Sequence, residues 1–541
     1  MSATDQPLTE TEYQSWISFS RTTAAELNAM GWQMAGFDYL PRISVALVIS
    51  DADEVWIKRS VDCVLGQVYP YLELCICDNG SRRSHVAEVL ESYAAADERV
   101  KVRRLPDREG WGTAYNAAIS MATGDFVTLL EGGDELAPEA LFKVVEVLQH
   151  ARADVVYTDE DHIDVGNRRS EPVFKPPWSP DLLLSTAYIG RLCVMRRSVL
   201  EAVGTFREGF EGAEEHDLTL RLSEETDSVR HLPEVLYHRR RLPGTLEKPR
   251  LSSGAIEDAL IRRGADARVE RGMVEGSFRV VWSLEDRPRV SAVVLFPEEV
   301  VKSPVLSELE QETSYPIHQV LAVNAEYMEH PSVAGVSHPF PARALNLAAE
   351  KSEGEYLVFV DARARITDPG WLQEMLRQAR RQEVGAVGCK LVNVDGSLRY
   401  GGSLTEMDWL SGSLEERVSE GGHYLPLVDH TFNFGAASSE CMVVRKAVFH
   451  SIGGFDDANL PTAFYDLDLS FRLREIGLKN VYTPYARVIG RGGRKVPSEG
   501  EVWYMWSRWW NELVQLLYYQ RSPLHPAYHG LDKEALSVAS G

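Results

Sequence analysis

The chain has 541 residues, too many for a single hydrophobic core, so two or three domains are expected. It is 44% hydrophobic and 25% charged, which is the composition of an ordinary globular protein. Its formal net charge of −23 repels polyanions and argues against nucleic acid as a partner.

The beginning of the chain is polar and acidic and lacks the pattern of a signal peptide. No stretch reaches the roughly 18 apolar residues of a membrane-spanning helix. The cysteines show neither a disulfide framework nor zinc-site spacing, so we expect reduced, buried thiols. They are Cys63, Cys75, Cys77, Cys193, Cys389 and Cys441. These features favour a cytoplasmic protein, either free or peripherally bound at the inner face of the membrane.

Short apolar runs alternate with helical periods along most of the chain, which predicts an α/β fold with a mainly parallel sheet. Residues 42–49, 72–77 and 126–130 are predicted strands, and residues 114–122 a predicted helix. Asp78 follows the second of these strands, and an acidic cluster follows the third. Ligands of open α/β sheets bind beyond the carboxyl ends of the strands, so both acidic stretches lie where a ligand is expected.

The sequence contains two similar halves. Residues 42–49 resemble 289–296, and residues 195–206 resemble 444–455. An Asp-Leu motif at Asp217 returns at Asp468, 251 residues later, while Ser291 follows Ser44 by 247. Because order and spacing are both kept, the chain is predicted to hold two copies of one domain. The predicted divisions are a helical segment (1–41), a first domain (42–244), a linker (245–288), a second domain (289–497) and a C-terminal helix with a tail (498–541).

The C-terminal segment is rich in aromatic residues. Apolar residues at 502, 506, 509, 513 and 516 form a helical stripe. One interpretation is packing onto the second domain or onto a partner subunit in a homo-oligomer. The other is an interfacial helix at a membrane, where tryptophan is favoured, although only Arg508 and Arg521 are basic nearby.

The ordered series of motifs resembles the family 2 glycosyltransferases, from Tyr13 to about residue 490. The linking stretches 259–264 and 276–282 are similar to those of tandem-domain members associated with bacterial surface polysaccharide synthesis. The resemblance implies two tandem GT-A domains, which are Rossmann-like and bind nucleotide-sugars. It also implies inverting transfer of a sugar from a nucleotide-sugar to a glycan or lipid-linked glycan, assisted by a divalent cation such as Mn²⁺ or Mg²⁺.

In the first half, the resemblance assigns a role to each matching residue. Asp78 matches the acid that contacts the nucleotide base, and Glu131 and Asp134 match the D-x-D region that contacts ribose and metal. The principal metal-binding position is Gly133, which departs from the family. Glu215 matches the general base, and His238 matches a late metal ligand. Two further matching stretches, containing Asp159 and Asp181, line the sugar region of family members.

The second half departs differently. Asp361 matches the first acid of the D-x-D region, but Arg363 stands at a metal-ligand position and Arg491 near the late histidine. Asp466 keeps the base position. Either the arginines replace the cation with fixed charge, or this copy has decayed. Metal and donor binding are therefore expected in the first copy.

Each assignment has a plainer alternative. Asp78 is also an ordinary turn residue, Glu131 and Asp134 fit a solvated acidic turn, and Glu215 fits an acid favoured at a helix N-terminus. His238 fits a packed or exposed histidine. The degenerate metal motifs in both halves leave open a second function, that of a catalytically inactive scaffold or glycan-binding protein.

Overall fold

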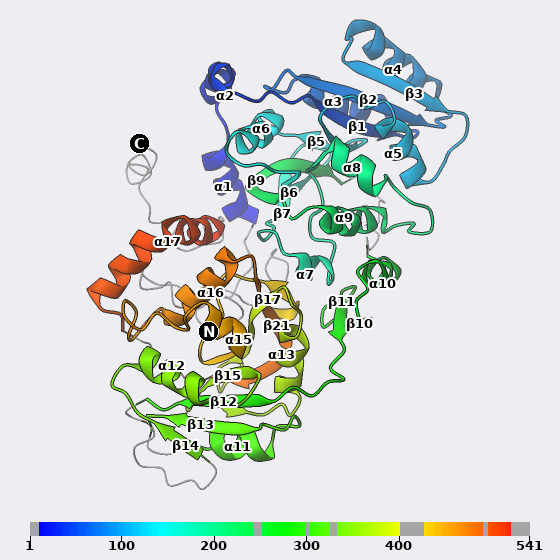
Figure 1. Cartoon of the computed structure of the whole chain (residues 1–541). Coiled ribbons are helices and arrows are strands. Elements are labelled where there is room, and N and C mark those ends of the chain that lie inside the picture. Colours follow the sequence, from blue (N-terminus) through cyan, green and yellow to red (C-terminus); the bar gives the residue numbers. More distant parts are fainter. Residues whose placement is uncertain are drawn as a thin grey trace.

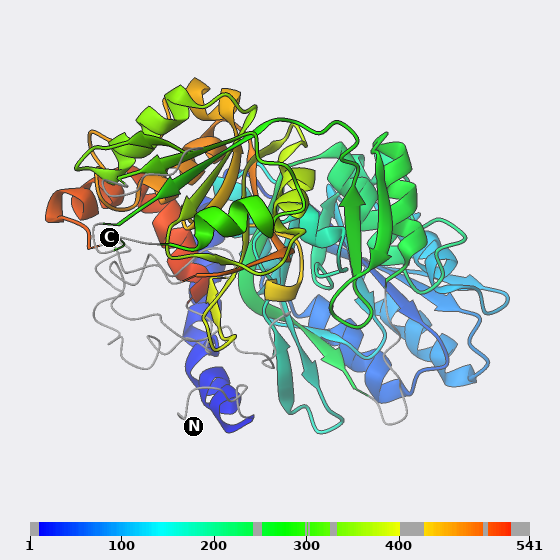
Figure 2. The same ribbon diagram turned by 90° about the horizontal axis from the view of Figure 1, so that it is seen from below.

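The computed structural model describes residues 10–241, 251–297, 300, 303–324, 333–400, 427–490 and 496–520. Two large α/β lobes follow one another along the chain. They are stacked in the view of Figure 1 and lie side by side in the view of Figure 2. The N-terminal segment forms α1 (Glu10–Ser20), α2 (Ala24–Gln33) and the turn η1 (Met34–Gly36).

The first lobe is built on a nine-stranded sheet of order β3-β2-β1-β4-β8-β6-β9-β5, with β7 paired to β6. Its central strands are parallel, and β8 runs antiparallel between β4 and β6. The strands are β1 (Ile43–Ile49), β2 (Leu72–Asn79), β3 (Val100–Leu105), β4 (Phe126–Glu131), β5 (Glu135–Leu136), β6 (Val155–Ile163), β7 (Arg169–Val173), β8 (Cys193–Arg196) and β9 (Val229–Arg240). The helices are α3 (Glu54–Leu65), α4 (Ser84–Ala96), α5 (Trp111–Ile119), α6 (Ala140–His150), α7 (Pro180–Leu183), α8 (Arg197–Val203) and α9 (Glu214–Glu225).

The second lobe repeats this topology. Its ten-stranded sheet has the order β14-β13-β12-β15-β20-β17-β21-β16, and β18 and β19 pair with β17 and β21. The strands are β12 (Val290–Leu295), β13 (Gln319–Val323), β14 (Val333–Val336), β15 (Tyr356–Asp361), β16 (Arg365–Ile366), β17 (Val384–Val392), β18 (Leu398–Tyr400), β19 (Phe432–Asn433), β20 (Cys441–Arg445) and β21 (Lys479–Ile489). The helices are α11 (Val305–Gln311), α12 (Pro341–Lys351), α13 (Trp371–Ala379), α15 (Lys446–Ser451) and α16 (Tyr465–Glu475), with the turn η3 (Leu427–Asp429).

The identical order of the matching strands confirms the predicted fold class of two tandem α/β domains. Local packing is repeated as well. Asn116 exchanges two hydrogen bonds with the backbone of Phe206, and Asn346 does the same with Phe455. These asparagines tie α5 and α12 to the loops that follow α8 and α15, and they fix the same inter-element geometry in both lobes. The exact domain boundaries remain a prediction.

Between the lobes the chain forms α10 (Ser253–Arg262) and the antiparallel hairpin β10 (Ala267–Arg271) and β11 (Phe278–Trp282). These elements lie at one side of the junction (Figure 1). Buried side chains on one face of the first sheet join those of the second lobe in a single hydrophobic cluster. The other face of the first sheet has a separate core, closed by α3 and α6. The apolar core is therefore continuous from one lobe to the other.

The C-terminal helix α17 (Glu499–Gln520) bends at Trp509, whose φ of −117° is not helical. Met505, Trp509 and Leu513 are buried, and Trp509 packs on Phe471 of α16. Trp503 faces solvent with 73% of its surface exposed. This arrangement matches the packing interpretation of the stripe. Among the described helices, none combines the length and apolarity needed to cross a membrane. All six cysteines are free thiols, buried or half-buried.

Candidate active site of the first domain

The site lies at the carboxyl ends of β2, β1 and β4. Strand β1 runs between the other two, with Ile49 beside Asp78 and Val48 beside Glu131, so the two acids flank the end of β1. Asp78 and Glu131 are 53 positions apart in sequence. The parallel pairing of their strands with β1 places both at the same edge of the sheet. This is the edge of the sheet at which the strand pattern predicts a ligand.

The Asp78 carboxylate is 1% exposed and holds the turn after β2. Its Oδ1 accepts a hydrogen bond from the Ser81 amide at 3.0 Å. Its Oδ2 is buried without a hydrogen bond and lies 3.3 Å from Nε of Arg104. A buried carboxylate oxygen that lacks a donor can accept one from a ligand, and the imide of a nucleotide base is such a donor.

The centre of the site is Arg191, which is 2% exposed. Its Nε donates to Oε1 of Glu215 at 2.8 Å, and a second guanidinium nitrogen contacts the same carboxylate. Its remaining terminal nitrogen donates to Oε2 of Glu131 at 3.1 Å. The ring of Trp111 lies 5.4 Å from the guanidinium carbon. One buried arginine therefore joins the predicted base to the predicted ribose-binding acid.

The charges of this group stabilise one another. Burial opposes the charge on Arg191, but Glu215 and the neighbouring acidic groups hold its pKa well above the usual value. Behind it, Glu160 accepts from the Arg191 amide at 2.7 Å and from Nζ of Lys175 at 3.0 Å. Arg239 lies 2.9 Å from the other Glu160 oxygen. A cavity of about 160 Å³, lined by Arg191, Glu215, Lys175 and several apolar side chains, adjoins this cluster.

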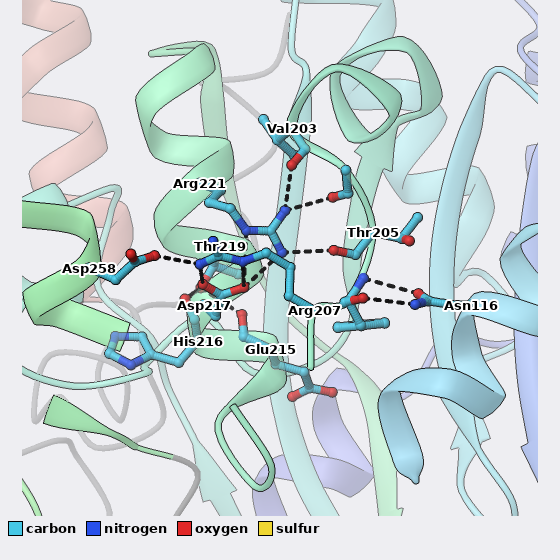
Figure 3. Close-up of polar contacts among 12 residues, drawn as sticks. Asn116, Val203, Thr205, Arg207, Glu215, His216, Asp217, Thr219, Arg221 and Asp258 are labelled. Atoms are coloured by element: carbon cyan, nitrogen blue, oxygen red, sulfur yellow. Dashed lines mark hydrogen bonds and ion pairs between the residues drawn. The ribbon is translucent and has the colours of Figure 1, made fainter. Parts of the chain in front are cut away.

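Glu215 sits in the first turn of α9, where the helix dipole favours an acid. The neighbouring repeated aspartate, Asp217, has a different role (Figure 3). It accepts hydrogen bonds from Nε of Arg221 at 3.0 Å and from Arg207. Arg221 in turn donates to the carbonyl of Val203 at 2.6 Å, at the end of α8. The repeated Asp-Leu motif therefore holds two helices together, and only its neighbour Glu215 faces the Arg191 cluster.

The two residues predicted to bind metal lie in separate clusters. Asp134 is buried, and it accepts hydrogen bonds from the Tyr237 hydroxyl and from the Arg240 amide at 2.7 Å. Burial and the nearby Glu131 raise its pKa to about 7. His238 instead lies 2.6 Å from Oδ1 of Asp161.

Asp161 connects His238 to the N-terminal segment, because its other oxygen accepts from the Tyr13 hydroxyl at 2.6 Å. Among the described residues, no hydrogen bond or ion pair is seen between the side chains of His238 and Asp134. Nor does that part of the chain contain any three His, Cys, Asp or Glu side chains grouped as metal ligands would be. With Gly133 in place of a ligand and Glu131 paired to Arg191, these residues do not fit a divalent cation.

Two other residues predicted to line the sugar region form hydrogen bonds or ion pairs within the protein. Asp159 accepts from the Lys175 amide at 2.9 Å and lies 2.8 Å from Nε2 of His231. Asp181 reaches the second lobe, where Arg381 donates to its Oδ1 and the side-chain amide of Asn433 to its Oδ2, both at 2.6 Å. The structure thus places Asp181 in the junction between the lobes.

In the second lobe, the predicted residues are also paired within the protein. Arg363 donates to both oxygens of Asp361, at 2.9 and 2.8 Å. Asp466 is buried and accepts from the Ser439 amide at 2.8 Å. Arg491 lies outside the described residues.

Sequence reasoning missed Arg191, Tyr237 and Lys175, which organise the first site. One signal for Arg191 was available, since it is a lone charge within the apolar stretch 188–194. A charged residue in such a stretch is expected to be paired. Its partners come from elsewhere in the chain, so only the fold identifies them.

Comparisons with known proteins identify relatives of this chain. Residues 44–204 match the family model of glycosyl transferase family 2. The chain is 34% identical over 517 residues to an O-antigen biosynthesis protein RfbC of Myxococcus xanthus, covering 90% of this chain and 40% of the relative. It is 32% identical over 518 residues to an uncharacterized protein y4gI of Sinorhizobium fredii, covering 87% and 56%. The chain thus spans about half the length of these curated relatives.

Among solved structures, residues 1–349 of S. aureus TarS in complex with UDP-GlcNAc are similar, at 18% identity and a TM-score of 0.34. That match covers 40% of this chain and 64% of the other. Fold and site define an α/β protein with a ligand edge at its strand ends. Residues 44–204 resemble a glycosyl transferase family 2 domain.

Proposed function

We propose that this chain is an inverting glycosyltransferase of bacterial surface polysaccharide synthesis, with its reaction centre in the first domain. The donor is a nucleotide-sugar, and the acceptor is a glycan or a lipid-linked glycan. The observation that carries the proposal is the meeting of Glu215 and Glu131 on Arg191 at the strand ends. Asp78 lies at the same edge of the sheet, on the other side of β1 from Glu131. We assign the first domain to residues 42–244 and the second to 289–497.

The proposed reaction needs one base. The acceptor hydroxyl attacks the anomeric carbon of the donor, its proton passes to the Glu215 carboxylate, and the bond to the nucleoside diphosphate breaks. Attack from the face opposite the leaving group inverts the configuration. Glu131, whose side chain is 43% exposed, is available to accept a hydrogen bond from a ribose hydroxyl. Asp78 would accept from the nucleotide base.

The second domain is proposed to have no catalytic role. Both oxygens of Asp361 are bound to Arg363, and Asp466 accepts backbone hydrogen bonds in the interior. Peripheral membrane association is also proposed, through the exposed Trp503 and Trp510 of α17. Loss of sedimentation with zwitterionic lipid vesicles in a variant with both residues changed to Ala would support it, and unchanged sedimentation would contradict it.

The test of function uses Glu215→Gln in the full chain, with Asp466→Asn as the matched control at the equivalent position. The release of UDP or GDP is measured over a panel of UDP-sugars and GDP-sugars. Glu215→Gln removes the base but keeps the shape, so release should fall roughly 10²- to 10⁴-fold while donor binding persists. Asp466→Asn should retain release near the wild-type rate. Loss in Asp466→Asn alone would move the reaction to the second domain. If the wild type binds none of the donors, the scaffold alternative is favoured.

A further inference from the structure

The two lobes carry an arginine at different positions around the acid that ends the central strand. Glu131 and Asp361 correspond, since each ends the strand beside the first strand of its sheet. Counting along from them, Gly133 corresponds to Arg363. Thr128 faces Val194 in the first lobe and Val358 faces Val443 in the second, so Arg191 corresponds to Glu440.

Despite these different positions, an arginine pairs with the strand-end acid in both lobes. In the first, Arg191 donates to the strand-end carboxylate of Glu131 at 3.1 Å. In the second, Arg363 donates to the strand-end carboxylate of Asp361 at 2.8 Å. Glu440, which stands where the first lobe has Arg191, is neutralised by Arg399 at 2.9 Å. The guanidinium that pairs with the corresponding acid thus comes from a different backbone position in each lobe.

We infer that each domain carries its own cation, Arg191 in the first and Arg363 in the second, and that the donor site accepts a nucleoside diphosphate without a divalent metal ion. This inference rests on the proposed function for the identity of the ligand. The ion pairs around the first site support the resident cation. Arg191, Lys175 and Arg239 balance the charges of Glu131, Glu215 and Glu160.

The physical reason is competition for the same carboxylate. A divalent ion on Glu131 would lie within a few ångströms of the Arg191 guanidinium, in a region where solvent screens charge weakly. The arginine cannot leave easily, because Glu215 holds it through two nitrogens and the rings of Trp111 and Tyr115 lie 5.4 and 5.9 Å from its guanidinium carbon. A guanidinium is also a good partner for the charge of a diphosphate.

The experiment compares the wild-type chain with Arg191→Met. Direct Mn²⁺ binding is followed by the electron paramagnetic resonance signal of the free ion, and UDP and GDP binding by calorimetry in EDTA and in MnCl₂. The wild type should leave Mn²⁺ free, and its nucleotide Kd should agree within about twofold in the two buffers. Arg191→Met leaves Glu131 and Glu215 without their cation, so it should gain Mn²⁺ binding. Its nucleotide affinity in EDTA should fall about tenfold or more, because the two carboxylates left without their cation repel the diphosphate.

Two further variants keep the test decisive. Arg59→Met removes a half-exposed arginine that pairs with Glu135 at 3.4 Å, and it should behave as the wild type. Glu131→Gln keeps the guanidinium and removes the acid that a divalent ion would use, so it should gain no Mn²⁺ binding, and its nucleotide affinity should fall only by the lost ribose contact. If Arg191→Met does not fold, the wild type and Glu131→Gln still give the answer.

The inference is overturned if the wild type binds Mn²⁺ directly, or if Mn²⁺ tightens its nucleotide binding tenfold or more. It is also overturned if Arg191→Met folds and gains no Mn²⁺ binding. Absence of all nucleotide binding by the wild type would instead contradict the proposed function. The direct Mn²⁺ titration would still test whether Arg191 takes the place of a divalent ion.

Discussion

At the scale of single residues, the repeated aspartates show how a buried charge is kept. Asp217 pairs with Arg221 one helical turn later, and Asp468 pairs with Arg472 in the same way. Both arginines use their remaining donors on carbonyls at the end of the preceding helix. Fully bonded charges of this kind are tolerated in an interior, whereas one partner left alone is costly. The motif is therefore best explained by packing, although it lies only two residues from the proposed base.

Asp217→Asn should destabilise the protein without changing the chemistry of the site. The substitution leaves the buried Arg221 beside a neutral group, which should cost about 3 kcal/mol. Thermal denaturation would measure this as a lower Tm.

Asp258→Asn is the matched control, because it removes the outer, half-exposed partner of the same Arg207. A surface pair of this kind contributes at most about 1 kcal/mol. Equal losses of stability in the two variants would refute the structural role of Asp217.

At the scale of elements, α17 closes the second lobe through one face. Its buried residues Met505, Trp509 and Leu513 follow helical spacing, and the bend lies at Trp509 itself. The indole Nε1 of Trp509 donates to Oδ1 of Asp468 at 2.9 Å. The helix is thus anchored both by apolar packing and by the buried ion pair of α16.

Trp509→Ala should cost about 3 to 5 kcal/mol, since it creates a cavity and removes a donor from a buried carboxylate. Trp503→Ala, on the exposed side of the same helix, should change stability by no more than about 0.5 kcal/mol. Chemical denaturation of both variants tests the assignment of the two faces. A large effect of Trp503→Ala would mean that this face is also covered.

At the scale of the whole molecule, the two lobes are joined by a small polar network inside an apolar contact. Asp181 of α7 receives hydrogen bonds from Arg381 and Asn433, and the Asn433 amide donates to the hydroxyl of Ser179 at 2.8 Å. Asp181 and Arg381 are largely withdrawn from solvent. A buried charged pair of this kind is expected to fix the relative orientation of the lobes.

Asp181→Ala should loosen the junction and leave each lobe folded. Removing one partner of a buried pair costs about 3 to 5 kcal/mol, enough for amide exchange in the peptide containing β19 to rise more than about tenfold. Hydrogen exchange read by mass spectrometry measures this directly.

Asp227→Ala is the control across the same junction. Asp227 is 84% exposed and lies 3.5 Å from Lys479, so its loss should leave exchange in β19 unchanged. Unchanged exchange in Asp181→Ala as well would show that apolar contact alone orients the lobes.

Several features of this protein could be predicted from the sequence because they are local or repeated. The alternation of strands and helices predicts the α/β class, and the recurring motifs predict two lobes of one topology. The placement of Asp78 and Glu131 at the ligand edge follows from their positions after strands. The carboxylate of Glu215 is likewise placed by a helix N-terminus that the motif marks.

Other features were decided only by tertiary structure. Nothing near Arg191 in sequence shows that it meets Glu131, 60 positions earlier, and Glu215, 24 positions later. Similarly, Asp134 and His238 have motif positions that suggest one site, yet Tyr237 and Asp161 engage them separately. Asp181 finds its partners 200 and 252 residues away. The type of each residue limits which partners can satisfy a buried charge, but the folded backbone determines which of those partners comes within reach.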